Sequence, residues 1–182
     1  MQQSMVSDIY TTMPSSEGRE AKEMAVYELL EQLGIPFARV DHPAMATVDS
    51  CSEVSEKLGI TICKNLFLCN ASKKQFYLLM MPGEKRFHTK EFSKQIGSSR
   101  LSFAPEEYME EFLSITPGSV SVLGLMNDVR GKVALYIDRE VIEKEYIGCH
   151  PCKNTSSLRI KTEDVINKFL PYVNHEMHIV DL

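Results

Sequence analysis

The chain has 182 residues, of which 43% are apolar and 25% are charged, and its formal net charge is -5. This composition is typical of a globular domain, and the length favours one domain, because about 150 residues already bury roughly 70% of their unfolded surface. No apolar run reaches the roughly 18 residues of a membrane span. The start, MQQSMVSDIYTT, lacks the basic-then-apolar layout of a secretory signal. We therefore expect a cytoplasmic protein without a membrane partner, and the negative charge argues against a DNA-coating protein.

The first half of the chain predicts two helices, a strand and a β-hairpin. The stretch "SSEGREAKEMAVYELLEQLG" predicts a helix that Ser15 or Ser16 caps and that stops before a proline. The run "FARVDH" suits a short strand. Ser50 and Glu53 form a capping-box pair, which predicts a second helix that ends at Gly59. The apolar runs "CKNLFLCN" and "QFYLLMM", separated by "ASKK", predict the hairpin.

The second half predicts short helices among further strands. Helices are expected over 89–96 and 105–113, the second with Pro105 in its first turn. The runs "VSVLGLM", "KVALYID", "KEYIGC" and "SLRIK" predict strands, followed by a helix that Thr162 caps and a last strand, "MHIVDL". Because strands and helices alternate without a βαβ rhythm, we predict an α/β fold of the α+β type, a single domain with a mixed sheet and helices around it. Residues 1–15 are expected to form a loose extension and 16–182 the domain.

The pair Cys149 and Cys152 forms a C-H-P-C sequence that suggests thiol chemistry. A redox C-x-x-C needs its first thiolate at a helix N-terminus, and the following "KNTSSLRIK" is not helical. A zinc site needs four ligands, and no second C-x-x-C or H-x-x-x-H accompanies the pair. We therefore predict packing or loop cysteines, with no metal and no cofactor.

Two other polar features each admit a functional and a purely structural interpretation. Lys64 and Asn65 interrupt the apolar run 60–68, where a charge is costly unless it faces a cleft or a partner. The alternative is that Lys64 lies on the exposed face of a strand and extends its ammonium into water. His42 and His150 each precede a proline, and taken singly both are more often hydrogen-bonded loop residues than catalysts.

Positive charge concentrates in one part of the sequence, between Lys64 and Arg100, where only Glu84 and Glu91 oppose it. The basic residues there are Lys64, Lys73, Lys74, Lys85, Arg86, Lys90, Lys94 and Arg100. This pattern indicates either solvated faces that differ in sign or a local phosphate-binding surface.

Five segments taken together resemble a known family. They are "DHPAMAT", "CKNLFL" with "YLLMMPGEKR", "GSSRLSFAPEEYMEEFLSITPGSVSVLGLMND", "KVALYID" and "HPCKNTSSLRI". Their order and spacing are similar to those of the free-standing bacterial prolyl-tRNA editing proteins, the YbaK/ProX-like aminoacyl-tRNA deacylases, which are related to the editing domain inserted in prolyl-tRNA synthetase. The resemblance extends from about residue 16 to 182. It implies a mixed, partly rolled sheet with helices around it, and hydrolysis of alanine wrongly esterified to proline tRNA.

The resemblance also implies residue roles. In the family the K-N-L-F motif and the H-P-x-x-N-T loop line the site for the aminoacylated terminal adenosine. The implied catalytic residues are Lys64 and His150, and the implied substrate-binding residues are Asn65, Pro151, Asn154 and Thr155. From the basic segment we expect tRNA contacts at Lys73, Lys74, Lys90 and Lys94. The expected partner is the acceptor end of tRNA(Pro), with prolyl-tRNA synthetase or an elongation factor as proteins that could hand it over.

Two departures from the family pattern bear on the pocket. Ser156 and Ser157 stand where relatives usually have alanine and threonine, and Cys152 replaces a common leucine. Gly148 lies only three residues before Pro151, whereas the inserted domains carry a G-x-x-x-P loop, so we give it little weight. Two alternatives stay open: a deacylase for another amino acid, such as cysteine, and a non-catalytic module that binds tRNA or a synthetase.

Overall fold

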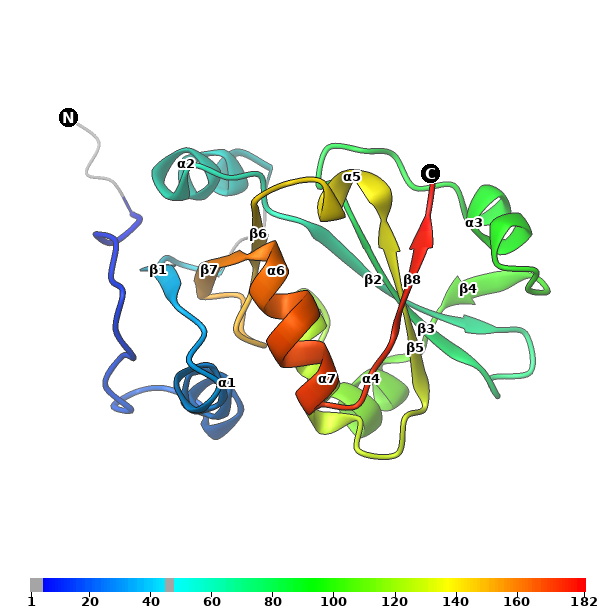
Figure 1. Cartoon of the computed structure of the whole chain (residues 1–182), viewed down its shortest axis with the longest axis horizontal. Helices are drawn as coiled ribbons and strands as arrows, with labels where there is room; N and C mark the ends of the chain where they lie inside the picture. Colours follow the sequence, from blue (N-terminus) through cyan, green and yellow to red (C-terminus); the bar gives the residue numbers. More distant parts are fainter. Residues whose placement is uncertain (1–4, 45–47) are drawn as a thin grey trace.

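The structure is a computed structural model that describes residues 5–44 and 48–182, with the backbone alone for 48–51. It contains two β-sheets with helices between and around them (Figure 1). A three-stranded antiparallel sheet has the order β1-β7-β6, and a five-stranded mixed sheet has the order β4-β2-β3-β5-β8. The predicted fold class, a mixed sheet surrounded by helices, is confirmed.

The described strands are short, and β2 and β3 form the predicted antiparallel hairpin. Strand β3 also pairs in parallel with β5, and β5 pairs in parallel with β8. The bounds are β1 Phe37–Asp41, β2 Lys64–Asn70, β3 Phe76–Met81, β4 Leu101–Phe103, β5 Val133–Asp138, β6 Tyr146–Cys149, β7 Ser156–Lys161 and β8 Met177–Val180. The sequence predicted all of these strands except β4.

The helices lie close to their predicted positions. They are α1 Ala21–Gln32, α2 Val48–Leu58, α3 Thr89–Gln95, α4 Glu106–Leu113, α5 Arg139–Ile142, α6 Thr162–Asp164 and α7 Leu170–Tyr172. A π-helical turn, Val165–Phe169, joins α6 to α7. The four-residue helix α5 was not predicted.

The segment "VSVLGLM" is a 3-10 helix, η1 (Val122–Asn127), and its prediction as a strand was wrong. Ser121 caps it by accepting a hydrogen bond from the Leu123 N–H at 3.2 Å. The turn packs closely on the end of α4, since a Cβ added to Gly124 would lie 2.5 Å from Ile115 Cδ1. The apolar character of the segment was interpreted correctly, but apolar runs this short do not distinguish a strand from a buried helical turn.

Three predicted helix caps were also wrong. Helix α1 begins at Ala21, and Ser15 accepts a hydrogen bond from the Glu17 N–H instead. Helix α2 begins at Val48, so Ser50 lies inside its first turn, and the side chain of Ser50 is outside the described part of the chain. Thr162 is the first helical residue, and its hydroxyl donates to the Lys144 carbonyl at 2.6 Å.

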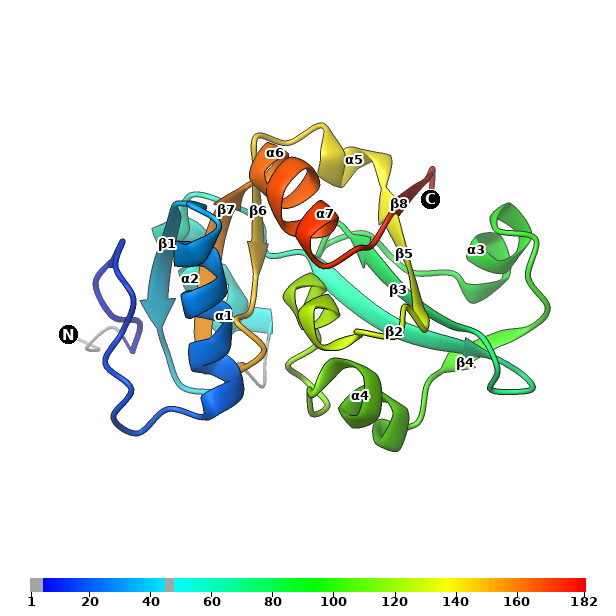
Figure 2. The same cartoon turned by 60° about the horizontal axis from the view of Figure 1, so that its bottom comes forward.

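The main hydrophobic core draws residues from both sheets and from helices that include α1 and α4. Figure 2 shows the arrangement of these elements. Strand β3 shows how the five-stranded sheet divides its side chains between two cores. Phe76, Leu78 and Met80 face the main core, whereas Tyr77, Leu79 and Met81 face a second cluster that includes Phe92 of α3. All six are buried, so β3 has no polar face and serves as the centre of the scaffold.

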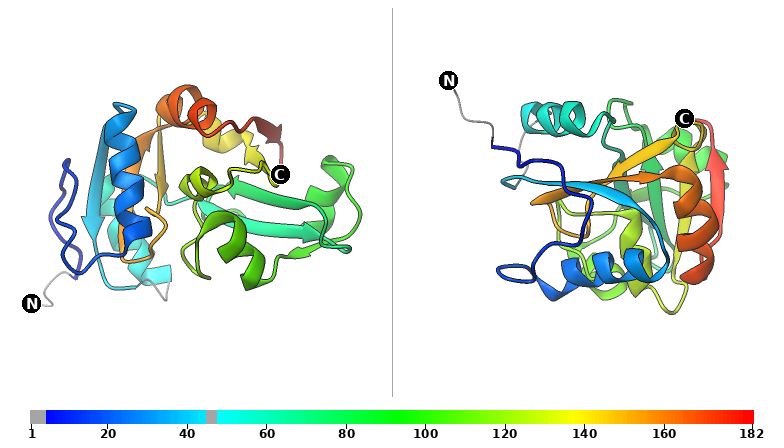
Figure 3. Two further views of the ribbon diagram at one scale, coloured as in Figure 1. Left: turned by 90° about the horizontal axis from the view of Figure 1, so that it is seen from below. Right: turned by 60° about the vertical axis from the view of Figure 1, so that its left-hand side comes forward.

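The three-stranded sheet is covered by α1 on one face and by α2 on the other (Figure 3). Phe37 of β1 belongs to the main core with α1, and Ala38 and Val40 pack against α2. The N-terminal segment from Met5 runs beside β1, and the Ser7 N–H donates to the Asp41 carbonyl at 2.8 Å. Residues 1–4 lie outside the described chain, and the division at residue 15 stays a prediction. No helix in the described ranges is long and apolar enough to cross a bilayer.

Candidate active site

The K-N-L-F motif lies at the start of β2, where Lys64 and Asn65 are half-buried. The Lys64 ammonium donates a hydrogen bond to the Lys85 carbonyl at 2.7 Å. Lys85 is itself held by Asp138 and Glu140, at 2.9 and 2.7 Å. Lys64 is therefore fixed against the loop after β3, and an ammonium has two further N–H donors for a ligand.

Asn65 has a buried acceptor without a partner. Its Oδ1 is buried and has no hydrogen bond among the described residues, while its Nδ2 makes one long contact, 3.5 Å, with the Cys63 carbonyl. Buried polar atoms are rarely left unpaired in folded proteins, and exceptions concentrate where a ligand or water completes the bonding. Asn65 Oδ1 is thus an unsatisfied acceptor inside the fold, next to the first residue of β2.

The two sheets meet at a single bridge next to both predicted motifs. Ile62 and Gly148 form a parallel bridge, and the Cys63 N–H donates to the Gly148 carbonyl at 3.0 Å. Lys64 follows Ile62 by two residues, and His150 follows Gly148 by two residues. The bridge therefore joins the two segments just before each motif begins.

Two glycines allow this close approach. A Cβ on Gly148 would lie 2.3 Å from Ile60 Cδ1 and 2.8 Å from Ile62 Cδ1, and a Cβ on Gly83 would lie 2.2 Å from the Ile62 carbonyl oxygen. Three segments, the link into β2, the loop after β3 and the end of β6, pack together at this point. Gly148, to which the sequence interpretation gave little weight, is needed for this packing.

The H-P-x-x-N-T loop is packed between two other segments. Cys152 is buried and adopts a left-handed backbone, with φ of 59°. Asn154 Nδ2 lies 3.6 Å from the position of a Cβ on Gly118, and the Thr155 carbonyl accepts from the His42 N–H at 3.0 Å. The loop thus contacts both the "TPGS" turn and the end of β1, which fixes the position of His150 at its start.

The His150 ring is anchored by β7. Its Nδ1 lies 2.8 Å from the Ser156 carbonyl and 3.5 Å from Ser157 Oγ, and Ser157 Oγ lies 2.9 Å from His42 Nε2. The two imidazole ring centres are 6.3 Å apart. Burial lowers the pKa of His150, and the nearby His42 adds to this effect against the Ser156 carbonyl. His150 is therefore neutral at neutral pH and able to accept a proton.

The cysteines of C-H-P-C are ill suited to thiol chemistry. Burial raises the pKa of Cys152 to about 12 and that of Cys63 to about 11, and it raises the pKa of the fully buried Cys149 as well. The thiolate is the nucleophilic and metal-binding form, so it is scarce in these residues at neutral pH. The C-H-P-C sequence is a structured loop flanked by cysteines.

Sequence reasoning missed a buried polar cluster on the α1 side of β1 and β7. Asp41 accepts hydrogen bonds from Arg19 at 2.8 Å, from Arg39 at 2.7 Å and from Ser156 at 2.7 Å. Glu23, almost fully buried, pairs with Arg19 at 2.6 Å. Burial raises the pKa of Asp41, but the hydrogen bonds from Arg19 and Ser156 outweigh it and the pKa is lowered overall. The departure at Ser156 therefore points into this cluster.

The predicted tRNA-binding lysines are exposed but do not form one patch with Lys64. Lys73 and Lys74 lie in the turn between β2 and β3, about 20 Å along β2 from Lys64 at about 3.3 Å per residue. Lys90 and Lys94 lie on α3, beside β4 (Figure 1). A surface cleft at α3 is lined by Thr89, Lys90, Ser93, Arg100 and Leu101.

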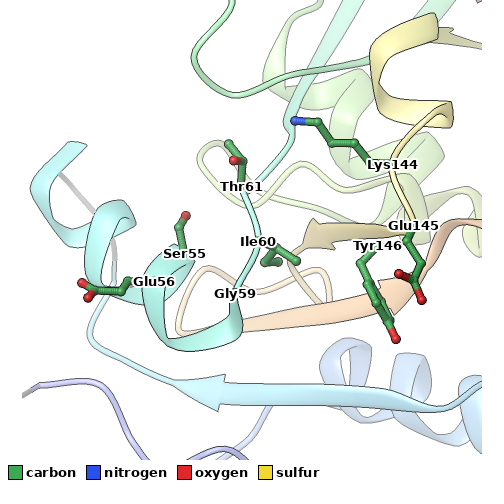
Figure 4. A pocket seen from close by; sticks show the side chains of 8 residues that line it. All are labelled: Ser55, Glu56, Gly59, Ile60, Thr61, Lys144, Glu145 and Tyr146. Atoms are coloured by element: carbon green, nitrogen blue, oxygen red, sulfur yellow. The ribbon is translucent and has the colours of Figure 1, made fainter.

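A larger cleft, of about 640 Å³, opens beside the link that leads into β2 (Figure 4). Its lining is Ser55, Glu56, Gly59, Ile60, Thr61, Lys144, Glu145 and Tyr146. Lys144 is exposed and extends toward this link, and it was not among the predicted site residues. It lies outside the basic stretch of sequence and therefore gave no signal there.

Residues 42–168, which include both motifs, match the aminoacyl-tRNA editing domain. The chain belongs to this family and is an aminoacyl-tRNA deacylase, a hydrolase that cleaves the ester between amino acid and tRNA. It is similar to the prolyl-tRNA editing protein ProX of Acetoanaerobium sticklandii, with 30% identity over 146 residues that cover 80% of this chain and 88% of ProX.

Two further comparisons agree with this assignment. The putative prolyl-tRNA synthetase associated domain-containing protein 1 of Homo sapiens is 29% identical over 86% of this chain and 94% of its own. The crystal structure of a putative trans-editing enzyme for prolyl tRNA synthetase superposes with a TM-score of 0.65 at 15% identity, covering 90% of this chain and 98% of that one. The second likeness supports the fold.

Proposed function

We propose that the protein is a trans-editing hydrolase that removes alanine from mischarged proline tRNA, Ala-tRNA(Pro). The proposal is supported by the family match over residues 42–168 and by the bridge between Ile62 and Gly148, which lie two residues before Lys64 and His150 respectively. The similarity to ProX, named as a prolyl-tRNA editing protein, supports proline tRNA as the substrate. Editing of this kind maintains the fidelity of translation.

An aminoacyl ester is already activated, so the site needs only to hold the ester, position a water and stabilise the developing charge. In this proposal the Lys64 ammonium binds a phosphate or ribose oxygen of the terminal adenosine. Asn65 Oδ1, buried and unpaired, accepts from a ribose hydroxyl or the amino group of the substrate. Pro151, Asn154 and Thr155 shape the loop against which the amino acid lies.

Alanine is the expected substrate because a proline pocket cannot strongly reject a smaller side chain, since each missing carbon changes binding by only about 1–3 kcal/mol. A second, smaller site corrects the error. Of the departures from the family pattern, Cys152 packs in the main core and Ser156 bonds to Asp41, whereas Ser157 Oγ lies 3.5 Å from His150 Nδ1. The alanine specificity itself is carried over from the family resemblance.

The tRNA acceptor end is expected to approach across the cleft that Lys144 borders, with the α3 cleft and its Lys90 and Arg100 as a second phosphate contact. Lys94 adds positive charge to the same helix. Lys73 and Lys74 lie at the far end of the hairpin and would meet only a more distant part of the tRNA.

A link to prolyl-tRNA synthetase is supported by the proline–tRNA ligase of Methylobacillus flagellatus, which is 30% identical over 100 residues, 52% of this chain and 17% of the ligase. The elongation factor has no comparable support and remains a prediction from the sequence.

A deacylation panel tests the proposal, with alanine, cysteine, serine and proline each charged on proline tRNA. We expect fast release of alanine and little release of proline, with a mock preparation from cells that lack the protein as the control for contaminating hydrolases. Faster release of cysteine would show a deacylase of another specificity. Binding of tRNA with every ester left intact would identify a non-catalytic module and overturn the proposal.

A further inference from the structure

The hydrogen bonds around His42 define where its proton lies. His42 Nδ1 is 2.8 Å from the Pro43 carbonyl oxygen, which can only accept, so Nδ1 carries the hydrogen. The ring is buried, and its other nitrogen, Nε2, lies 2.9 Å from Ser157 Oγ. In a neutral imidazole the other nitrogen is an acceptor, so the Ser157 hydroxyl donates to His42 Nε2 at 2.9 Å.

The same reasoning fixes the proton of His150. Its Nδ1 faces the Ser156 carbonyl at 2.8 Å, so Nδ1 is the donor. The Ser157 hydroxyl, whose hydrogen points to His42, presents only lone pairs toward His150 Nδ1, 3.5 Å away. An unprotonated Nδ1 would face two hydrogen-bond acceptors, so the Nδ1–H tautomer is favoured. The lone pair then resides on Nε2, for which the described residues offer no hydrogen-bond partner.

The strands position this arrangement. Ser157 lies opposite Val40 in the register of β1 and β7, and Val40 packs toward α2. Ser156 lies opposite Asp41 and points to the other face, toward Arg19. Since neighbouring residues of a strand alternate between faces, the two serines serve different clusters.

We propose that Ser157 and His42 are positioning residues that hold His150 in the tautomer with a bare Nε2, and that this nitrogen is the general base of the deacylation. Water attacks the ester carbonyl carbon while His150 Nε2 takes its proton. The bond between the carbonyl carbon and the ribose oxygen then breaks, and the proton passes from Nε2 to that oxygen. The products are the free amino acid and tRNA with its terminal hydroxyl restored. This inference rests on the proposed function.

The tautomer can be measured without substrate, by NMR of protein with ring-¹⁵N histidine and with the His150 signals assigned through His150→Gln. In the wild type we expect a protonated Nδ1 and a bare Nε2. Ser157→Ala should raise the Nε2–H population, Ser157→Thr should restore the wild-type pattern because it keeps a hydroxyl, and Tyr77→Phe should leave it unchanged. Tyr77 is the matched control, since its hydroxyl bonds Gln75 at 3.0 Å in the other sheet. A wild-type His150 protonated on Nε2 overturns the inference, whatever the protein hydrolyses.

Kinetics supply the second measurement. Ser157→Ala should lower kcat for Ala-tRNA(Pro) by about 10-fold with little change in KM, since it alters the base and leaves the binding groups. In a His150→Ala background the same substitution should have no further effect, because a positioning residue acts only through its target. Additive losses would refute the positioning role. If no aminoacyl-tRNA is hydrolysed by the wild type, the proposed function fails while the NMR result still decides the tautomer.

Discussion

The two sheets bury different kinds of side chain. In the five-stranded sheet the central strand β3 is apolar on both faces, and its residues fill two hydrophobic clusters. In the three-stranded sheet β1 and β7 bury Arg39, Ser156 and Ser157, with His42 just past the end of β1. Buried polar groups are tolerated only when they are hydrogen-bonded, and here they are bonded to one another. The five-stranded sheet is therefore called the scaffold sheet below, and the three-stranded sheet, which holds these buried polar side chains, is called the polar sheet.

The candidate site lies at the boundary between these regions and draws on both. Lys64 comes from the five-stranded sheet, at the first residue of β2, while His150 follows β6, an edge strand of the three-stranded sheet. The bridge from Ile62 to Gly148 joins the two segments two residues before Lys64 and His150. Substitutions on either side of this boundary should therefore separate activity from stability.

The largest effect is expected for Lys64→Ala. If Lys64 contacts the terminal adenosine, the substitution should lower deacylation by about 100-fold or more, equal to roughly 2.7 kcal/mol of transition-state stabilisation. The unfolding free energy should change by less than about 1 kcal/mol, because the Lys64 ammonium makes one hydrogen bond to a carbonyl. Single-turnover deacylation and urea unfolding measure the two quantities.

Lys64→Arg should recover only part of the activity, because a planar guanidinium does not replace a compact ammonium. Lys161→Ala, which removes a half-buried lysine from the other sheet, is the matched control and should be neutral. A Lys64→Ala protein that hydrolyses Ala-tRNA(Pro) at the normal rate would remove Lys64 from the site.

Gly148→Ala should destabilise the fold at the contact between the two sheets. The new Cβ would lie within 2.8 Å of the Cδ1 atoms of Ile60 and Ile62, and overpacking of this kind costs roughly 1–3 kcal/mol. Activity should fall as well, because the overpacked contact involves the two segments that lead to Lys64 and to His150. Thermal and urea unfolding give the cost.

The compensating substitution Ile60→Val removes the closest Cδ1 and should recover part of the loss in the double variant. Simple additivity of the two changes would mean that the contact with Ile60 is not the source of the strain.

Much of the fold could be predicted because local signals and tertiary packing agree. The hairpin β2–β3 has two apolar runs and a polar turn, and β5 is an apolar run between turn residues. In both cases the apolar pattern and the turn-forming residues that bound it indicate the same structure. The segment 120–126 failed because its apolar residues fit a buried 3-10 turn as well as a strand, and only its packing on α4 decides. The helix caps failed because several serines can cap and tertiary contacts choose among them.

The site was only partly predictable. Lys64 stood out as a charge in an apolar run, and His150 through its resemblance to a family motif. Ser157 and His42 could not be paired from the sequence, since 115 residues separate them and the β1–β7 register brings them together. A hint existed in the two His-Pro dipeptides, but nothing in the sequence indicates that their rings lie 6.3 Å apart.

A buried ionisable pair beside the five-stranded sheet departs from this contrast, and its effect on stability can be tested by varying the pH. In the loops that precede β5 and β8, Asp128 and His175 form a buried pair, with Nε2 and Oδ2 2.9 Å apart, while His175 Nδ1 contacts the Val173 carbonyl at 2.8 Å. Hydrogen bonding to Asp128 raises the pKa of His175 against the effect of burial. Burial raises the pKa of Asp128, but the His175 bond and the N–H groups of Lys132 and Val133 outweigh it, so that pKa is lowered.

The pair should therefore stabilise the fold within one pH window. The raised pKa of His175 contributes stability that is complete below about pH 6.5 and is lost as pH rises through the folded pKa. The lowered pKa of Asp128 contributes stability present above about pH 4 and lost as pH falls through its folded value. His175→Gln should cost about 1.5 kcal/mol between these limits and less on either side, measured by urea unfolding from pH 3 to 9. A cost that is the same at every pH would show that the pair is not ionised.

The smallest effect is expected at the exposed end of the scaffold sheet. Lys90 and Lys94 lie on α3, and replacing both by alanine should weaken tRNA binding modestly, because each exposed contact contributes less than about 1 kcal/mol. The clearer signal is the salt dependence. Each phosphate contact adds roughly 0.7–0.9 to the slope of log affinity against log salt concentration, so the double variant should lower the slope by about 1.4–1.8. Lys132→Ala with Lys161→Ala, an exposed and a half-buried lysine outside the basic segment, should leave the slope unchanged. An unchanged slope in the α3 variant would mean that the tRNA phosphates do not contact Lys90 or Lys94 and that the tRNA lies elsewhere on the protein, with the Lys144 cleft as the next surface to test.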